Sequence, residues 1–410
     1  MPATARALVV PMSGAIVILL TFSISRRYFS ETAALTAACL MATSPVFLFQ
    51  LVQPMSDVPV TACWLAAACA LTDTRARGAI GAGLWSSLAV LVRPNLAPLL
   101  LPCAGLCVAA AGGGLPRRLR NGVLFVVASS LGCLLVAWAH SVFYGSPFVS
   151  GYGRVAELFA VNPVSANLQR YASWLWQTQS PFVYLAVLAL APFVARALPR
   201  GGLAFLWFAL AFFCGLVTLY LPYYSFDHWT YLRFLLPGLP LVLVLASGVW
   251  VALGRLVDSR WGAAAVAVVG LLVLVQIQTA VNGDAFRLRT AFENRYRVAG
   301  AFIDWQYPPN AVFLSVVQSG SVRYYGHRES VRFDWLGEGE LDRAVADLAR
   351  GGFRPFFLLD VTEIEGFRKR FAAFSRLGRL DWEPRDRIGH QGDVLVFDPE
   401  HVVPSGRPER

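Results

Sequence analysis

Residues 1–280 hold only six carboxylates, and a carboxylate is one kind of side chain that can act as an acid or base. They are Glu31, Asp57, Asp73, Glu157, Asp227 and Asp258. Asp57 differs from the others because it lies in a short polar stretch, residues 53–59, between two apolar runs. A carboxylate held there can take the proton of an attacking hydroxyl group. The alternative is that Ser56 or Asp57 only caps the next helix, with Pro59 in its first turn.

Two arginines stand where they could bind a phosphate group. Arg233 follows an aromatic stretch, residues 223–232, and Arg93 ends another apolar run in Leu-Val-Arg-Pro-Asn. A guanidinium can form paired hydrogen bonds with a phosphate, so both are predicted to bind a lipid-linked phosphate. For Arg93 the alternative is a side chain that extends to the membrane surface. An interfacial aromatic belt accounts for most aromatic residues beside Arg233.

Three further polar residues are candidates for a substrate groove. Asp227 and His228 lie in the aromatic stretch before Arg233, and Glu157 lies in residues 144–180, a segment too long for a simple connection. That segment is predicted to include an amphipathic stretch on the membrane surface. His228 could be an acid–base group or ligand, or purely structural. The sequence predicts no metal site and leaves the need for a divalent metal cofactor open.

Ten apolar runs must position these side chains. They cover residues 7–25, 33–52, 58–72, 78–92, 96–111, 122–143, 181–195, 203–221, 234–254 and 262–280. A membrane span needs about 20 residues, so the third, fourth, fifth and seventh runs are short. Hydrophobic residues form 56% of the chain and charged residues 15%, which predicts a polytopic α-helical membrane protein. No charged residue lies in the middle of a run, which argues against a proton-coupled transporter.

The arginines indicate which loops face the cytoplasm. Alternate loops of ten spans lie on opposite sides, and eleven arginines fall in one set against five in the other. The positive-inside rule makes the first set cytoplasmic and places Asp57, Arg93 and Arg233 on the outer side. The N-terminus then also lies outside, without a convincing signal peptide. We therefore expect an upstream helix and outer loop before residue 1; the alternative is a genuine N-out protein.

The charge composition of the chain changes near residue 281. Residues 1–280 carry 16 arginines and six acids, whereas residues 281–410 carry 19 basic and 19 acidic residues. Because the net charge of +10 is scattered over short loops, no nucleic-acid surface is expected. We predict a transmembrane domain over 1–280 and an extracytoplasmic α/β domain over 281–410. In the second domain, alternating helices and strands indicate a small, mainly parallel sheet, and Thr362-x-x-Glu365 fits a capping box.

Three motifs in the first domain resemble those of one enzyme family. They are Gln-Pro-Met-Ser-Asp-Val-Pro (53–59), Gly-Leu-Trp-Ser-Ser-Leu-Ala-Val-Leu-Val-Arg-Pro (83–94) and Trp-Thr-Tyr-Leu-Arg-Phe-Leu-Leu-Pro (229–237). In this order and on one side of the membrane, they resemble the dolichyl- or polyprenyl-phosphate-sugar glycosyltransferases of the GT-C fold. Protein O-mannosyltransferases and bacterial aminoarabinose transferases are members. The resemblance covers most of residues 1–280, and the polar tail resembles the extracytoplasmic domain of some bacterial members.

The resemblance implies inverting transfer of a sugar from a polyprenyl-phosphate-linked donor to a glycan, lipid or protein acceptor at the outer, periplasmic face. It implies that Asp57, which matches the acidic residue of the family's second outer loop, lies near the reacting centre. In this reading Arg93 or Arg233, predicted above from their guanidinium chemistry, lies near the donor phosphate. With 34 arginines and one lysine, the composition also suggests a GC-rich bacterial genome, and hence a bacterial inner membrane.

The family also has an acidic residue in its first outer loop, which has no counterpart here. We therefore expect the 410-residue chain to transfer sugar weakly or not at all, and an added upstream segment to restore transfer. The alternative functions are a lipid or polysaccharide flippase, another transport protein, or a non-catalytic relative of the glycosyltransferases.

Overall fold

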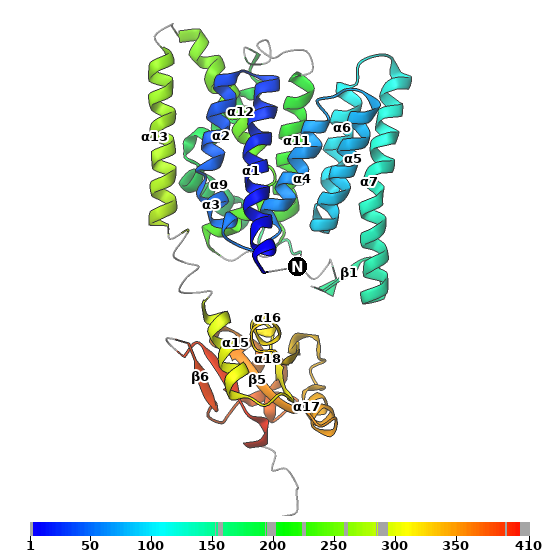
Figure 1. Cartoon of the computed structure of the whole chain (residues 1–410), viewed down its shortest axis with the longest axis vertical. Helices are drawn as coiled ribbons and strands as arrows, with labels where there is room; N and C mark the ends of the chain where they lie inside the picture. Colours follow the sequence, from blue (N-terminus) through cyan, green and yellow to red (C-terminus); the bar gives the residue numbers. More distant parts are fainter. Residues whose placement is uncertain are drawn as a thin grey trace, which may run out of the picture. The chain divides into compact units, whose positions relative to one another are not determined.

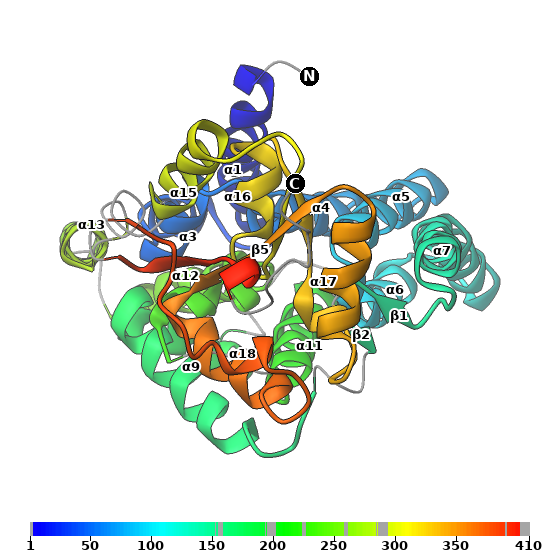
Figure 2. The same ribbon diagram turned by 90° about the horizontal axis from the view of Figure 1, so that it is seen from below.

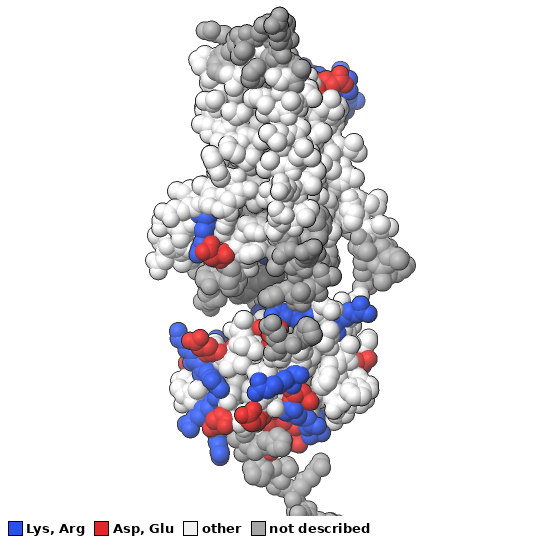
Figure 3. All heavy atoms as spheres, turned by 90° about the vertical axis from the view of Figure 1, so that its left-hand side faces the viewer, with Lys and Arg blue, Asp and Glu red and all other residues white. Residues whose placement is uncertain are grey.

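The structure is a computed structural model that describes residues 3–151, 153–154, 159–192, 194, 202–223, 227–257, 261–283, 285, 294–389 and 392–401. It divides into two compact units, Met1–Phe286 and Arg287–Arg410, and each is considered by itself (Figure 1). On the face shown in Figure 3, charged side chains are sparse on the first unit and dense, with both signs, on the second. The surfaces of the two units therefore suit lipid and water respectively.

The first unit is a bundle of helices. Its α-helices are α1 (Ala3–Tyr28), α2 (Glu31–Ala42), α3 (Pro45–Leu51), α4 (Asp57–Ala70), α5 (Ala76–Val92), α6 (Leu100–Ala110), α7 (Leu115–Tyr144), α9 (Val164–Gln179), α11 (Gly202–Tyr220), α12 (Leu239–Val257) and α13 (Trp261–Asn282). Its 3-10 helices are η1 (Pro94–Leu99), η2 (Pro181–Leu190) and η3 (Trp229–Leu235), and β1 (Val149–Ser150) pairs with β2 (Gly153–Arg154). Each predicted apolar run overlaps one or two of these helices, which confirms the polytopic α-helical fold.

Helix length separates the spans into three groups. Among the described residues, four helices are long and apolar enough to cross a membrane alone: Leu8–Tyr28, Leu115–Tyr144, Gly202–Tyr220 and Ala264–Asn282. Two more spans result if α2 with α3, bent by 58°, and η3 with α12, bent by 86°, each count as one. The four short apolar helices correspond to the four runs that are short in the sequence. Of these, α4 is mostly buried inside the protein, which shields it from lipid.

Close packing of small residues joins α5 to α7. A Cβ atom at Gly132 of α7 would lie 2.3 Å from the backbone oxygen of Ser87 in α5. One at Gly83 of α5 would lie 2.6 Å from the Cβ of Ala128 in α7. Without a side chain at these positions, the two backbones approach closely, as small residues allow in membrane helices. Figures 1 and 2 show the two helices side by side at one edge of the bundle.

The loops of the first unit gather at its two ends. The Asn121 side chain at the start of α7 donates a hydrogen bond to the backbone oxygen of Thr74, 2.9 Å away, so these two arginine-containing loops meet at one end. Asp57 begins α4 and Arg93 follows α5, whereas Thr74 lies in the loop between these two helices. Asp57 and Arg93 therefore lie together at the end of the bundle that is opposite to Thr74. The described loops around Thr74 and Asn121 and those around Asp57 and Arg93 thus lie at opposite ends of the bundle, as predicted (Figure 1).

The second unit is a five-stranded sheet with helices. Its strands are β3 (Ala311–Leu314), β4 (Glu329–Val331), β5 (Arg354–Asp360), β6 (Asp386–Ile388) and β7 (Val394–Phe397), in the order β4-β3-β5-β7-β6. Its α-helices are α15 (Asn294–Gln306), α16 (Ser319–Tyr324), α17 (Leu341–Arg350) and α18 (Ile364–Phe371). Short 3-10 helices are η4 (Phe333–Trp335), η5 (Val361–Glu363), η6 (Leu377–Arg379) and η7 (Pro399–His401). Two apolar cores contain side chains from this sheet.

Two expectations for the second unit were wrong in detail. The sheet is mixed: β3 pairs in parallel with β4 and β5, but β7 pairs antiparallel with β5 and β6. The sequence predicts strands at 311–317, 331–333, 356–359 and 394–397, but not the three-residue β6, because Asp386-Arg387-Ile388 has no apolar alternation to mark a strand. The capping box does not use Thr362 and Glu365. Asp360 is the N-cap of η5 and Glu363 is its partner, because β5 ends at Asp360 and η5 begins at the next residue.

Candidate functional site

Asp57 is the first residue of α4 and pairs with Arg93 at the end of α5. The distance from Arg93 Nη1 to Asp57 Oδ1 is 2.6 Å, and the side chains are 15% and 4% exposed. Ser56, the N-cap residue, makes no capping hydrogen bond with its side chain. Thus the carboxylate of Asp57 holds an arginine rather than capping its own helix. Arg93 in turn points to Asp57 rather than out to the membrane surface.

Pro94 explains why Arg93 stands at this position. A residue before proline is driven away from helical backbone angles, so α5 ends at Val92 and Arg93 adopts a non-helical conformation. The antiparallel return of α5 along α4 then carries Arg93 back to the beginning of α4. The contact between Asp57 and Arg93 therefore follows from two short helices and one proline.

Two aromatic rings hold the guanidinium of Arg93 from the other side. Its Cζ lies 5.5 Å from the ring centre of Tyr220, at the end of α11, and 5.4 Å from that of Phe234 in η3. These two rings stack on each other with centres 4.6 Å apart. The Tyr220 hydroxyl accepts a 2.8 Å hydrogen bond from the amide of Asn95. Cation–π contacts of this kind favour a cation in a partly desolvated place.

Arg233 lies on the same ring of Phe234. Its Cζ is 5.2 Å from the centre of Phe234 and 5.3 Å from that of Tyr231. Nη1 is 2.9 Å from the sulfur of Met55, a weak acceptor, and Nε is buried with no hydrogen-bond partner among the described residues. Unlike Arg93, Arg233 has no ion pair with a carboxylate in the part of the chain that is described. Its unsatisfied donors make it a good site for an anion.

The remaining predicted groove residues do not join this cluster through described contacts. Asp227 is 74% exposed and pairs with Arg170 Nε at 3.3 Å. His228 caps η3, and its Nδ1 lies 2.8 Å from the hydroxyl of Thr230. Burial lowers the pKa of the His228 imidazole, while the Asp227 carboxylate opposes this shift. Glu157 lies outside the described residues.

The charge of the cluster suits an anion better than a metal ion. Two guanidinium groups stand beside one carboxylate, so the three side chains together are positive. Among the described residues, no three His, Cys, Asp or Glu side chains come together as metal ligands. A cation would compete with Arg93 for Asp57, the carboxylate that pairs with Arg93 among the residues that the structure describes. The residues present therefore do not fit a metal centre at this position.

The sequence motifs contain part of this cluster but not all of it. Asp57, Arg93 and Arg233 come from the three motifs, and Phe234 and Met55 stand beside them in the same motifs. Tyr220 was missed because an aromatic residue at the end of an apolar run resembles any interfacial aromatic. Nothing in the sequence shows that its ring stacks on Phe234, since 14 residues separate the two.

Comparisons with known proteins identify the fold. Residues 3–143, about a third of the chain, match the family model described as dolichyl-phosphate-mannose-protein mannosyltransferase, and this region contains Asp57 and Arg93. A search of curated protein sequences gave no match.

Three solved structures are similar over nearly the whole chain. ArnT from Cupriavidus metallidurans bound to undecaprenyl phosphate has a TM-score of 0.58 and 14% identity, covering 95% of this chain and 83% of ArnT. The apo form of that protein has a TM-score of 0.57 and 14% identity, with 95% and 82% covered. The oligosaccharyltransferase of Archaeoglobus fulgidus, in complex with Zn and sulfate, has a TM-score of 0.53 and 12% identity, with 98% of this chain and 62% of that chain covered.

The chain is a multi-pass membrane protein with the GT-C fold, as the three sequence motifs predicted. At these low identities the likeness to the solved structures establishes the architecture. What the cluster of Asp57, Arg93 and Arg233 does must be argued from its own chemistry.

Proposed function

We propose that the protein is a glycosyltransferase that moves a sugar from a polyprenyl-phosphate-linked donor to a glycan, lipid or protein acceptor. The GT-C fold supports the class of reaction. The observation that carries the proposal is that Asp57, Arg93 and Arg233 meet around the ring of Phe234, at one end of the bundle. We place this end at the outer, periplasmic face of a bacterial inner membrane, because the opposite loops hold most of the arginines.

Arg233 is the first contact for the donor phosphate in this proposal. Its guanidinium is partly desolvated, lies on two aromatic faces and has donors that are free of carboxylate partners among the described residues. A phosphate can accept two hydrogen bonds from it. The similarity to ArnT, which was solved with undecaprenyl phosphate, supports a lipid phosphate as the ligand.

Arg93 has a different role because Asp57 already neutralises it. A phosphate that arrives at Arg233 competes with Asp57 for Arg93, whose ring contacts with Tyr220 and Phe234 stay in place. Transfer of Arg93 from the carboxylate to the phosphate leaves Asp57 free to accept a proton. Donor binding and activation of the base are thereby coupled.

The reaction step is a displacement at the anomeric carbon. The acceptor hydroxyl oxygen forms a bond to that carbon, and the bond from the carbon to the phosphate oxygen breaks. The proton of the hydroxyl group goes to the carboxylate of Asp57, and the lipid phosphate leaves with the bonding electrons, held by the two arginines. Positioned proton transfer of this kind contributes about 100- to 10,000-fold to a rate.

Binding and transfer together test the proposal. In lipid nanodiscs, Arg233→Gln should weaken undecaprenyl phosphate binding by about 10-fold or more, the range expected for losing hydrogen bonds to a charged group. Arg77→Gln is the matched control, since Arg77 is exposed and pairs with Asp73 in a loop at the other end of the bundle. Asp57→Asn should keep or tighten lipid binding, because Arg93 is released, and this readout does not depend on the low transfer rate expected for the 410-residue chain. Asp57→Asn should also abolish, per folded molecule, whatever sugar transfer the wild-type chain shows.

Two results would count against this assignment. Equal binding by the Arg233→Gln and wild-type proteins would remove the phosphate site. Sugar transfer at the wild-type rate by Asp57→Asn would remove the proposed base. A flippase would give a different result: it would move the lipid across the membrane of a vesicle without forming a new glycosidic bond.

A further inference from the structure

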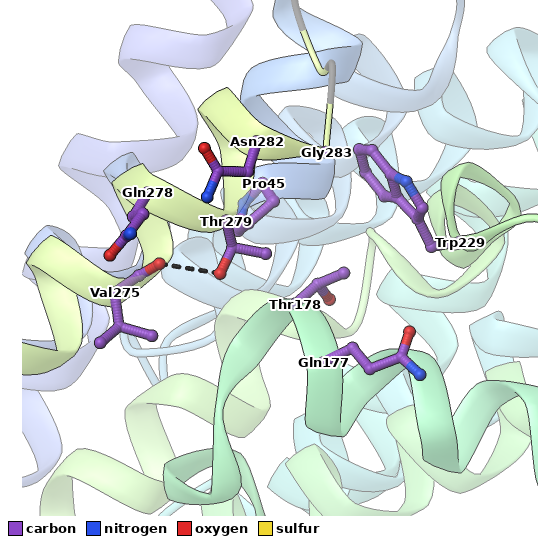
Figure 4. Close-up of a pocket in the computed structure, with 9 residues that line it drawn as sticks. All are labelled: Pro45, Gln177, Thr178, Trp229, Val275, Gln278, Thr279, Asn282 and Gly283. Carbon is purple, nitrogen blue, oxygen red and sulfur yellow. Dashed lines mark hydrogen bonds between the residues drawn. The ribbon is translucent and has the colours of Figure 1, made fainter.

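A separate cavity of about 370 Å³ lies in the membrane unit (Figure 4). Its lining residues are Pro45, Gln177, Thr178, Trp229, Val275, Gln278, Thr279, Asn282 and Gly283. The volume is within the range of about 300 to 1,000 Å³ that is typical of small-molecule sites. No residue of the Asp57 cluster lines it, so the cavity needs its own explanation.

Four segments far apart in the sequence build the walls. In Figure 4, Thr279 and Asn282 of α13 stand on one side and Trp229 of η3 on the other, while Gln177 and Thr178 of α9 lie below them. The Trp229 ring is set by an edge contact with Phe49 of α3, with centres 5.5 Å apart. The cavity is therefore framed by rigid helices rather than by loops.

A buried hydrogen-bond network fixes these walls to one another. The amide of Gln179 donates to the hydroxyl groups of Ser44 at 2.8 Å and of Thr178 at 3.2 Å. Gln276 of α13 donates to the Gln179 side-chain oxygen at 3.4 Å and accepts from Thr43 at 2.7 Å. Gln179 and Gln276 are each 1% exposed. Burying polar groups in an apolar bundle costs free energy unless they are hydrogen-bonded, and a connected network of hydrogen bonds makes the surrounding structure rigid.

The lining chemistry suits an uncharged sugar. Carboxamide groups of Gln177, Gln278 and Asn282 offer both donors and acceptors, which match hydroxyl groups that do the same. The apolar face of the Trp229 indole suits the C–H face of a sugar ring. The described lining residues include no Asp, Glu, Lys or Arg, so they offer no counter-charge to an amino sugar or a uronic acid.

One lining residue of the cavity, Trp229, belongs to the same short helix as the proposed phosphate ligand Arg233. Trp229 and Arg233 are on the same 3-10 helix, four residues apart, which corresponds to about 8 Å along its axis. That is on the order of the length of one sugar unit with its phosphate. We propose that this cavity binds the sugar of the lipid-linked donor, and that Trp229 and Asn282 select an uncharged sugar. This proposal rests on the proposed function, which places the donor phosphate at Arg233.

The test compares lipid phosphates that differ only in their sugar. The full chain in nanodiscs is titrated with undecaprenyl phosphate, undecaprenyl-phosphate-mannose, and undecaprenyl phosphate carrying an aminoarabinose or a glucuronic acid. The neutral mannose lipid should bind more tightly than the bare lipid and than both charged forms. Trp229→Ala should remove most of this preference, about 10-fold, and leave binding of the bare lipid unchanged. Asn282→Ala should reduce the preference about 3- to 10-fold, as for one or two hydrogen bonds.

Matched variants separate recognition from folding. Trp176→Ala removes a tryptophan that is 57% exposed on α9 and does not line the cavity, so it should leave the preference intact. Trp229→Phe keeps an aromatic face and should restore part of the preference. Asn282 is exposed on the last turn of α13, so Asn282→Ala should fold. If Trp229→Ala is unstable, the sugar preference of Asn282→Ala tests the proposal instead.

The outcomes that overturn the proposal are distinct from those that overturn the proposed function. If bare undecaprenyl phosphate binds but mannose adds nothing, or if a charged sugar is preferred, the cavity does not select a neutral sugar. The same holds if neither Trp229→Ala nor Asn282→Ala alters the preference. If none of the lipid phosphates binds, the phosphate site itself is wrong.

Discussion

The ion pair between Asp57 and Arg93 should be strongly coupled to the stability of the membrane unit. Its side chains are 4% and 15% exposed, so removing one partner leaves a charge in a poorly solvated place. Breaking such a buried pair generally costs about 3 to 5 kcal/mol in the free energy of unfolding. We expect Arg93→Met to fall in this range, because it leaves the carboxylate of Asp57 without a counter-ion.

Asp57→Ala should cost less, about 2 to 3 kcal/mol. The stranded guanidinium of Arg93 keeps its contacts with the rings of Tyr220 and Phe234, and each cation–π contact offsets about 0.5 to 1 kcal/mol. The double variant Asp57→Ala with Arg93→Met strands neither charge and should lie within about 1.5 kcal/mol of the wild type. The magnitude of the coupling free energy in the double-mutant cycle is then about 3.5 kcal/mol or more.

Unfolding of the full chain by SDS in mixed micelles, followed by helical circular dichroism, measures these differences. The expected order of stability is wild type, double variant, Asp57→Ala and then Arg93→Met. A coupling free energy below about 0.5 kcal/mol would show that the pair acts as an exposed one, and the reasoning from burial would be refuted. Asp57→Ala less stable than Arg93→Met would refute the role given to the two rings.

Two further predictions concern packing and pH. Gly132→Ala should lower the free energy of unfolding by about 1 to 3 kcal/mol, because its Cβ meets the backbone of α5. Gly270→Ala, with nothing within 4 Å, is the control and should be neutral or stabilising, so equal stabilities of the two variants would contradict close packing. Burial raises the pKa of the Glu363 carboxyl above its ordinary 4.5, more than its backbone hydrogen bonds from Asp360 and Val317 lower it. The stability from protonated Glu363 is therefore present below pH 4.5 and is lost as pH rises through the higher folded value. Glu363→Gln should gain stability relative to the wild type between about pH 4 and pH 7 in hydrogen-exchange measurements on β5, and a constant difference would contradict the shift.

The order and type of the membrane helices were predictable because hydrophobicity is read along the chain. Each apolar run overlaps a helix, and even the short runs proved short. The hydrophobic pattern did not reveal that α2 and α3, or η3 and α12, bend within one run, although Pro45 and Pro237 mark the two breaks in the sequence. In the second unit, buried strands could be recognised by their apolar residues, but their direction in the sheet could not. The apolar residues of β7, Val394–Phe397, are compatible with parallel or antiparallel pairing.

The sequence alone determined that Asp57, Arg93 and Arg233 lie at the same end of the bundle. Alternation of the spans suffices for this, because each crossing reverses the side. Only the tertiary structure decided that Asp57 pairs with Arg93 while Arg233 keeps donors unsatisfied, with Phe234 between the two arginines. The cavity beside Trp229 was likewise invisible in the sequence. Its walls come from four segments that meet only when the helices pack, and packing depends on three-dimensional side-chain fit that a linear pattern does not contain.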